Sequence, residues 1–171
     1  MRRFGHLPDR PGRLRTLVPM RATARGFTLV ELAIVLAIGA LIISIAAPML
    51  ANYFERARYV QSIVDLRDMQ KAIKQYEFSH GALPDSLADA SLDTKVDPWG
   101  RAYQYFNLRT AKGNGQARKD KKLAPLNSDF DLYSVGPDGL TAASLANGNS
   151  RDDVVRARDG GFLGTAEEFD P

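Results

Sequence analysis

The sequence predicts an α+β protein, in which a long N-terminal helix packs on a small antiparallel sheet with an irregular C-terminal loop. Three observations support this fold class. An uncharged, apolar run of 23 residues extends from Leu32 to Phe54. Apolar residues then recur at three- and four-residue steps, which is typical of a helix with one buried face. Short aromatic and β-branched runs follow, bounded by Gly and Pro, and these are typical of strands and turns.

The first 26 residues form a basic leader. They contain seven arginines and a single acidic residue, Asp9. The rest of the chain carries 16 basic and 19 acidic side chains, a formal charge of −3, although the whole chain is at +3. The basic balance therefore indicates membrane topology, and we expect no nucleic-acid binding by the folded part.

The uncharged run is long enough to anchor the chain in a membrane. As a helix it spans about 35 Å at roughly 1.5 Å per residue, and a hydrocarbon core is about 30 Å thick. Because positive charge lies only before it, we expect a cytoplasmic N-terminus and an exported C-terminal part. A plain signal anchor or a cleaved secretory signal would also fit these features. A twin-arginine signal at Arg2-Arg3 is disfavoured, since that pair lies far from the apolar run.

The start of the apolar run has a more specific pattern. The segment from Arg25 to Glu31, Arg-Gly-Phe-Thr-Leu-Val-Glu, resembles the recognition site of type IV prepilins and type II secretion pseudopilins. The resemblance implies that a prepilin peptidase cuts between Gly26 and Phe27, and that the new amine of Phe27 is methylated. It also implies that Glu31 pairs with the N-terminal amine of a neighbouring subunit during assembly. Pro48 falls where many family members carry a helix-kinking proline.

Physical chemistry favours the assembly role of Glu31, whereas Pro48 fits an assembly role and a proline that a membrane helix merely tolerates equally well. A lone carboxylate at the edge of an apolar helix is costly to bury and is usually functional. Proline removes one helical hydrogen bond, so Pro48 should bend or loosen the helix. The expected parts are a leader over 1–26, a transmembrane and filament-core helix over 27–51, and a periplasmic globular domain over 52–171. Met20 offers an alternative start that would give a shorter leader.

The exported domain should begin with the rest of the helix. Its apolar stripe consists of Val60, Ile63, Leu66, Met69, Ile73 and Tyr76. Gly81 is a good helix stop, with Pro84 just beyond it. Strands are predicted at 103–106 and 131–135, joined by a basic, solvated hairpin loop over 109–128. We expect two or three antiparallel strands in all, and then an irregular tail.

Two motifs in this domain narrow the resemblance. Asp-Pro-Trp-Gly at 97–100, and Asp-Leu-Tyr-Ser-Val-Gly-Pro-Asp-Gly at 131–139, are similar to the major, G-type pseudopilin of type II secretion. In that family calcium holds the C-terminal loop, and calcium prefers six to eight oxygen ligands. The resemblance implies a site made of Asp138, Asp152 and Asp153, with oxygens of Val135 and Ser134 as secondary ligands. The alternative is that Asp138 forms a turn and that Asp152 and Asp153 are solvated.

The sequence also departs from the pseudopilin pattern. The segment 139–151 is longer than expected, and Val154-Val155-Arg156 replaces the expected tryptophan-bearing ending. These departures count against the implied calcium ligands and against the assignment to the major pseudopilin.

The predicted function is structural, and we expect no enzymatic activity. The chain has no cysteine and two histidines, which excludes a disulfide, a thiolate nucleophile and a histidine cluster. The resemblance implies a homopolymeric pseudopilus subunit that drives protein export, with minor pseudopilins and an inner-membrane assembly platform as partners. The alternative is a type IV pilus subunit for adhesion, motility or DNA uptake. A third class is a signal-anchored binding module that never polymerises.

Overall fold

The computed structural model describes residues 26–113 and 115–169, and the chain divides into two compact units between Ile43 and Ser44. The leader over 1–25, together with the alternative start at Met20, lies outside the described residues. So does the end of the predicted tail, residues 170–171.

One long helix, α1, runs from Leu29 to His80, with Pro48 inside it. It ends where predicted: Gly81 has a φ of 75°, and its N–H donates to the carbonyl of Glu77 at 2.8 Å. A positive φ costs glycine little, which is why glycine commonly terminates helices. The prediction of one continuous helix that ends before Gly81 is confirmed.

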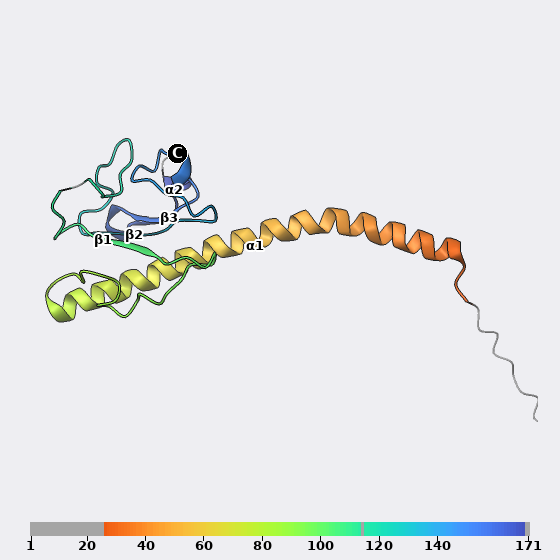
Figure 1. The fold of residues 1–171 in the computed structure, drawn as a ribbon, viewed down its shortest axis with the longest axis horizontal. Helices are drawn as coiled ribbons and strands as arrows, with labels where there is room; N and C mark the ends of the chain where they lie inside the picture. Colours follow the sequence, from red (N-terminus) through yellow and green to blue (C-terminus); the bar gives the residue numbers. More distant parts are fainter. Residues whose placement is uncertain (1–25, 114, 170–171) are drawn as a thin grey trace, which may run out of the picture. The chain divides into compact units, whose positions relative to one another are not determined.

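Four antiparallel strands follow α1 in the second unit (Figure 1). Strand β1 is Gln104–Asn107, β2 is Phe130–Ser134, β3 is Val154–Ala157 and β4 is Phe162–Thr165. The strands are hydrogen-bonded neighbours in chain order, and a short helix, α2 (Ala166–Phe169), ends the described chain. The α+β fold class and the hairpin of β1 and β2 are confirmed.

The core of the second unit forms on both faces of the sheet. On one face, Leu66, Met69 and Ile73 of α1 pack against buried side chains of the sheet, among them Phe130, Leu132 and Val154. On the other face a second cluster gathers buried residues from the loops, β3 and α2: Leu126, Leu145, Val155, Ala157, Ala166 and Phe169. Adjacent strand residues point to opposite faces, so Val154 and Val155 enter different clusters.

Several details of the sequence prediction are wrong. The loop over 109–128 is not solvated throughout, because Arg118, Asp120 and Leu126 are buried in it. Val60 is 61% exposed, so the buried stripe of α1 begins later than predicted. The irregular tail is wrong for residues 154–169, where β3, a 3₁₀ turn at Arg158–Gly160, β4 and α2 follow one another. The sheet therefore has four strands in the described residues, and the expectation of two or three was wrong. β3 was missed because all four of its residues are buried, so it lacks the alternation of a half-exposed strand.

Candidate functional site

The N-terminal junction is open to solvent. Gly26 and Phe27 precede α1 without regular structure, and the Phe27 ring is 87% exposed. A protease can therefore reach the backbone between them. Cleavage between Gly26 and Phe27 stays a prediction.

Glu31 takes part in a capping box at the start of α1. Its carboxylate accepts hydrogen bonds from the N–H and the hydroxyl of Thr28, both at 2.8 Å. In return, the N–H of Glu31 donates to the Thr28 hydroxyl at 3.1 Å. Such reciprocal bonds satisfy backbone donors that the first helical turn leaves free. This role was not predicted, although Thr-x-x-Glu before an apolar run is its signature. Thr28 thus holds the Glu31 carboxylate close to the residue whose amine cleavage would free.

The first half of α1 presents a continuous apolar surface. Every residue from 29 to 54 is exposed apart from Gly39, which is partly buried. Within the described residues, α1 is one helix whose length and composition suffice to cross a membrane. An apolar surface of this size marks contact with lipid or with other protein. Pro48 lies within it and is followed by further helix, as predicted.

The five predicted calcium ligands do not converge on one point. Asp152 accepts a hydrogen bond from the N–H of Asp138 at 3.2 Å, so these two residues lie together. Asp153 is instead fully buried and binds Arg118, while the Ser134 hydroxyl donates to Asp97 at 2.5 Å. No group of three or more His, Cys, Asp or Glu side chains that could hold a metal ion occurs in the described part of the chain. Calcium binding stays a prediction, and this donor set does not fit the ion well.

The two ends of the loop that connects β2 to β3 lie against each other. A methyl group on Gly136 would lie 2.5 Å from the carbonyl oxygen of Asp152, far inside contact distance. Gly136 also has a φ of 65°. Only glycine combines this backbone conformation with so close an approach.

A buried ion pair that was not predicted joins α1 to the sheet. Both terminal nitrogens of Arg156 donate to the carboxylate of Asp129, at 2.7 and 2.9 Å. Arg156 also donates to Gln70 of α1 at 2.7 Å, and its guanidinium lies 3.9 Å from the centre of the Phe130 ring. Lys74 of α1 binds Asp129 from the other side at 2.9 Å. An arginine in the apolar segment Val154–Ala157 was the signal for this contact.

The pair makes part of the stability pH-dependent. Burial alone would raise the pKa of Asp129, but hydrogen bonds from Arg156 and Lys74 outweigh it and hold the pKa well below its ordinary value of 3.8. A carboxyl group whose pKa is lower in the folded state stabilises the fold above its ordinary pKa. It loses that contribution as the pH falls toward its folded pKa.

We therefore expect the stability lost on Asp129→Asn to be largest at neutral pH and to shrink below about pH 4. Thermal unfolding of the wild-type and variant chains in detergent micelles, at about pH 7 and about pH 3, measures this difference. A difference that is equal at the two pH values would contradict the assignment.

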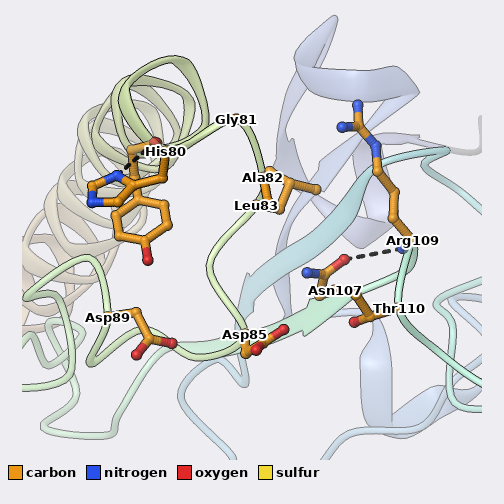
Figure 2. A pocket seen from close by; sticks show the side chains of 10 residues that line it. His80, Gly81, Ala82, Leu83, Asp85, Asp89, Asn107, Arg109 and Thr110 are labelled. Carbon is orange, nitrogen blue, oxygen red and sulfur yellow. Dashed lines mark hydrogen bonds between the residues drawn. The ribbon is translucent and has the colours of Figure 1, made fainter.

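An open pocket of about 470 Å³ lies beside the end of α1, and Figure 2 shows the residues that line it. The rings of Tyr76 and His80 stack with their centres 4.0 Å apart. Asp89 accepts a hydrogen bond from the N–H of Ser86 at 2.8 Å, and Arg109 binds Glu77. These polar groups bond within their own surroundings, and the residues that line the pocket include no nucleophile paired with a base. Nothing in this pocket indicates catalysis.

The N-terminal segment matches a known protein family. Residues 21–47 match the model of the prokaryotic N-terminal methylation motif. This stretch contains Gly26, Phe27 and Glu31, together with most of the uncharged run.

Whole-chain similarities extend beyond that motif. The chain is 32% identical to the type IV major pilin PilE of Neisseria gonorrhoeae, over 81% of this chain and 85% of the pilin. It is 31% identical to a fimbrial protein of Neisseria meningitidis serogroup A, over 82% and 83%. It is 26% identical to the type II secretion system core protein G of Pectobacterium carotovorum, over 73% and 83%. No solved structure matches the chain.

Proposed function

The chain belongs to the type IV pilin-like family, and from this premise we propose that it is the structural subunit of a type II secretion pseudopilus. Members of this family are structural subunits that polymerise into filaments after processing by a prepilin peptidase. The proposal concerns whether the filament belongs to a secretion system or to a pilus.

Processing comes first in the proposed sequence of events. The peptidase cuts between Gly26 and Phe27 and methylates the Phe27 amine. The exposure of this junction supports the step, because the backbone is accessible ahead of the first helical turn. Before assembly the chain resides in the bacterial inner membrane, with its N-terminus in the cytoplasm and its folded domain in the periplasm.

Assembly then moves the apolar surface of α1 from lipid to neighbouring helices. Both environments exclude water, so the transfer changes the hydrophobic free energy little and depends on packing and polar contacts. Glu31 supplies the polar contact, by pairing with the Phe27 amine of a neighbour. Pro48 leaves a helical hydrogen bond unmade and adapts the helix to its neighbours. An inner-membrane platform and minor pseudopilins complete the assembly.

One contact in the folded domain carries the secretion assignment. The two motifs that resemble the G-type pseudopilin meet each other, since Asp97 of the first accepts the hydroxyl of Ser134 in the second. Arg101, which follows the first motif, donates to the carbonyls of Gly136 and Pro137 at 2.7 and 3.1 Å. The motifs therefore act as one structural unit, which supports a shared origin with the secretion protein. The absence of cysteine agrees with it, because no disulfide can close the C-terminal loop.

A type IV pilus for adhesion, motility or DNA uptake is the second candidate. The identity of 31–32% to the two Neisseria proteins compared above favours it, since the secretion protein G of Pectobacterium carotovorum is 26% identical. The two candidates share the anchor, the cut and the polymer, and they differ in what the filament does.

Deletion of the gene in its host distinguishes them. We expect secreted proteins to accumulate in the periplasm and surface pili to remain, with secretion restored by a plasmid copy of the wild-type chain. Enzyme assays of the periplasm and the culture medium, with electron microscopy of the cells, measure both. A resident periplasmic enzyme serves as the control for an intact envelope. Normal secretion together with lost surface pili would overturn the secretion role in favour of the pilus.

A further inference from the structure

The loop between β2 and β3, residues 135–153, is long and largely irregular. It contains one short 3₁₀ turn, Gly148–Ser150. Its middle pairs with the preceding loop: the N–H of Lys119 donates to the carbonyl of Ala143 at 2.8 Å, and the N–H of Leu145 to that of Lys119 at 2.9 Å. Such a segment needs further bonds to hold one conformation, because ordering each residue costs roughly 1–2 kcal/mol of entropy.

A buried guanidinium supplies these bonds. Arg118 is 3% exposed, and its side chain donates to the hydroxyl of Thr141, to the carbonyl of Ala142 at 2.7 Å and to the carboxylate of Asp153. The Thr141 hydroxyl in turn donates to Asp153 at 2.7 Å. The guanidinium also lies 4.2 Å from the centre of the Tyr133 ring. One cation thus gathers a hydroxyl, a carbonyl and a carboxylate, the oxygen types that calcium takes.

A second arginine holds the start of the same loop. Arg101 binds the carbonyls of Gly136 and Pro137, as described above. A methyl group on Gly139 would lie 2.6 Å from Nε of Arg101, so the glycine lets the guanidinium pack against the turn. Two arginines therefore occupy oxygens at the start, the middle and the end of the loop.

Two further carboxylates of the loop accept hydrogen bonds from backbone N–H groups within it. Asp138 accepts the N–H of Leu140 at 2.7 Å, and Asp152 accepts that of Asp138. Nε of Arg118 and Oδ1 of Asp153, which are buried without a hydrogen bond, belong to the same ion pair.

We propose that the guanidinium of Arg118, assisted by Arg101, holds this loop in place of a metal ion. The folded domain is then independent of calcium. A guanidinium stays charged at any physiological pH and is weakly hydrated, which suits a buried cation. It is also covalently attached, so it cannot dissociate when the calcium concentration falls. The inference does not depend on whether the filament serves secretion or a pilus.

The test is thermal unfolding of the full processed chain in detergent micelles. Fluorescence of Trp99, the single tryptophan, reports on the folded domain, because its ring packs on Tyr59 at 5.0 Å. The wild-type chain is heated in chelator, in millimolar calcium and in magnesium at the same concentration. We expect the same melting temperature in all three solutions. A melting temperature that rises in calcium, but not in magnesium, would overturn the proposal.

Variants test the role assigned to Arg118. We expect Arg118→Met to lower the melting temperature by roughly 10 °C, because it leaves Asp153 buried without a cation. The matched control is Lys112→Met. Lys112 is exposed and lies, like Arg118, in the loop between β1 and β2, so this change should alter the melting temperature little. If Arg118→Met does not fold, Thr141→Val is the milder variant and should lose a few degrees in both chelator and calcium. Equal melting temperatures for Arg118→Met and Lys112→Met, or for Thr141→Val and the wild-type chain, would also overturn the proposal.

Discussion

Replacing Arg156 with methionine should lower the free energy of unfolding by about 3 kcal/mol or more, because it leaves the buried Asp129 with too few donors. Methionine keeps the length of the side chain, so the loss reflects charge and hydrogen bonds more than a cavity. Lys74, which binds Asp129 at 2.9 Å in the wild-type chain, is kept in the variant, so we expect a loss at the lower end of the range for broken buried pairs. Thermal or denaturant unfolding in micelles, followed by Trp99 fluorescence, measures the change.

The chain offers a matched control for this prediction. Arg151 is exposed, five residues before Arg156, and Arg151→Met should change the stability by less than about 0.5 kcal/mol. Combining Arg156→Met with Asp129→Asn should cost less than the two changes add up to, because the second removes the charge that the first leaves unpaired. An Arg156→Met variant as stable as Arg151→Met would show that the pair contributes nothing.

Replacing Glu31 with alanine should leave processing intact and abolish filaments. If Glu31 pairs with the amine of a neighbour, its loss leaves that amine unpaired in a medium of low dielectric constant. Such a cost is about 3–5 kcal/mol, which weakens association by at least about a hundredfold. Mass spectrometry of the N-terminus checks processing, and electron microscopy of cells that overproduce the chain checks assembly.

The capping box allows the charge of Glu31 to be separated from its role in the helix. Glu31→Gln keeps an acceptor for the N–H of Thr28 but removes the charge, since glutamine also serves in capping boxes. Thr28→Ala removes the cap and keeps the charge. We expect Glu31→Gln to assemble as poorly as Glu31→Ala, while processed Thr28→Ala still forms filaments. Filaments from Glu31→Gln in normal amount would assign the role to capping and refute the charge pairing.

The sequence predicted those parts of the structure that depend on local patterns. The uncharged run and Gly81 defined α1 at both ends, because helix length and helix termination depend on a few neighbouring residues. The hairpin of β1 and β2 was predicted for the same reason, as aromatic residues favour strands and Gly and Pro mark the turns that bound them. The predicted ranges of these strands differ from the observed ones by a single residue.

The buried charges were beyond this kind of prediction. Arg118 lies in a basic, polar segment that was interpreted as a solvated loop, and its burial depends on Asp153, 35 residues further on. Arg156 likewise depends on Asp129 and on Gln70, 86 residues before it. A charged residue at the surface and one in a buried pair look the same in sequence, since the partner is brought near only by the fold. The C-terminal calcium site was inferred from resemblance alone, and the contacts of its residues lead to a different account.

The contact between Gly136 and Asp152 determines where the sequence of this protein can accept insertions. The chain leaves the sheet after β2 and returns to it at β3, at nearly the same place. The contact between the two ends of the loop therefore does not depend on the residues between them. Its most exposed part is residues 146–149. Lengthening a closed surface loop costs little free energy, about 0.6 kcal/mol for a doubling of its length. Insertions there would alter the surface that the filament displays while leaving the strands, the anchor and the subunit contacts of α1 in register.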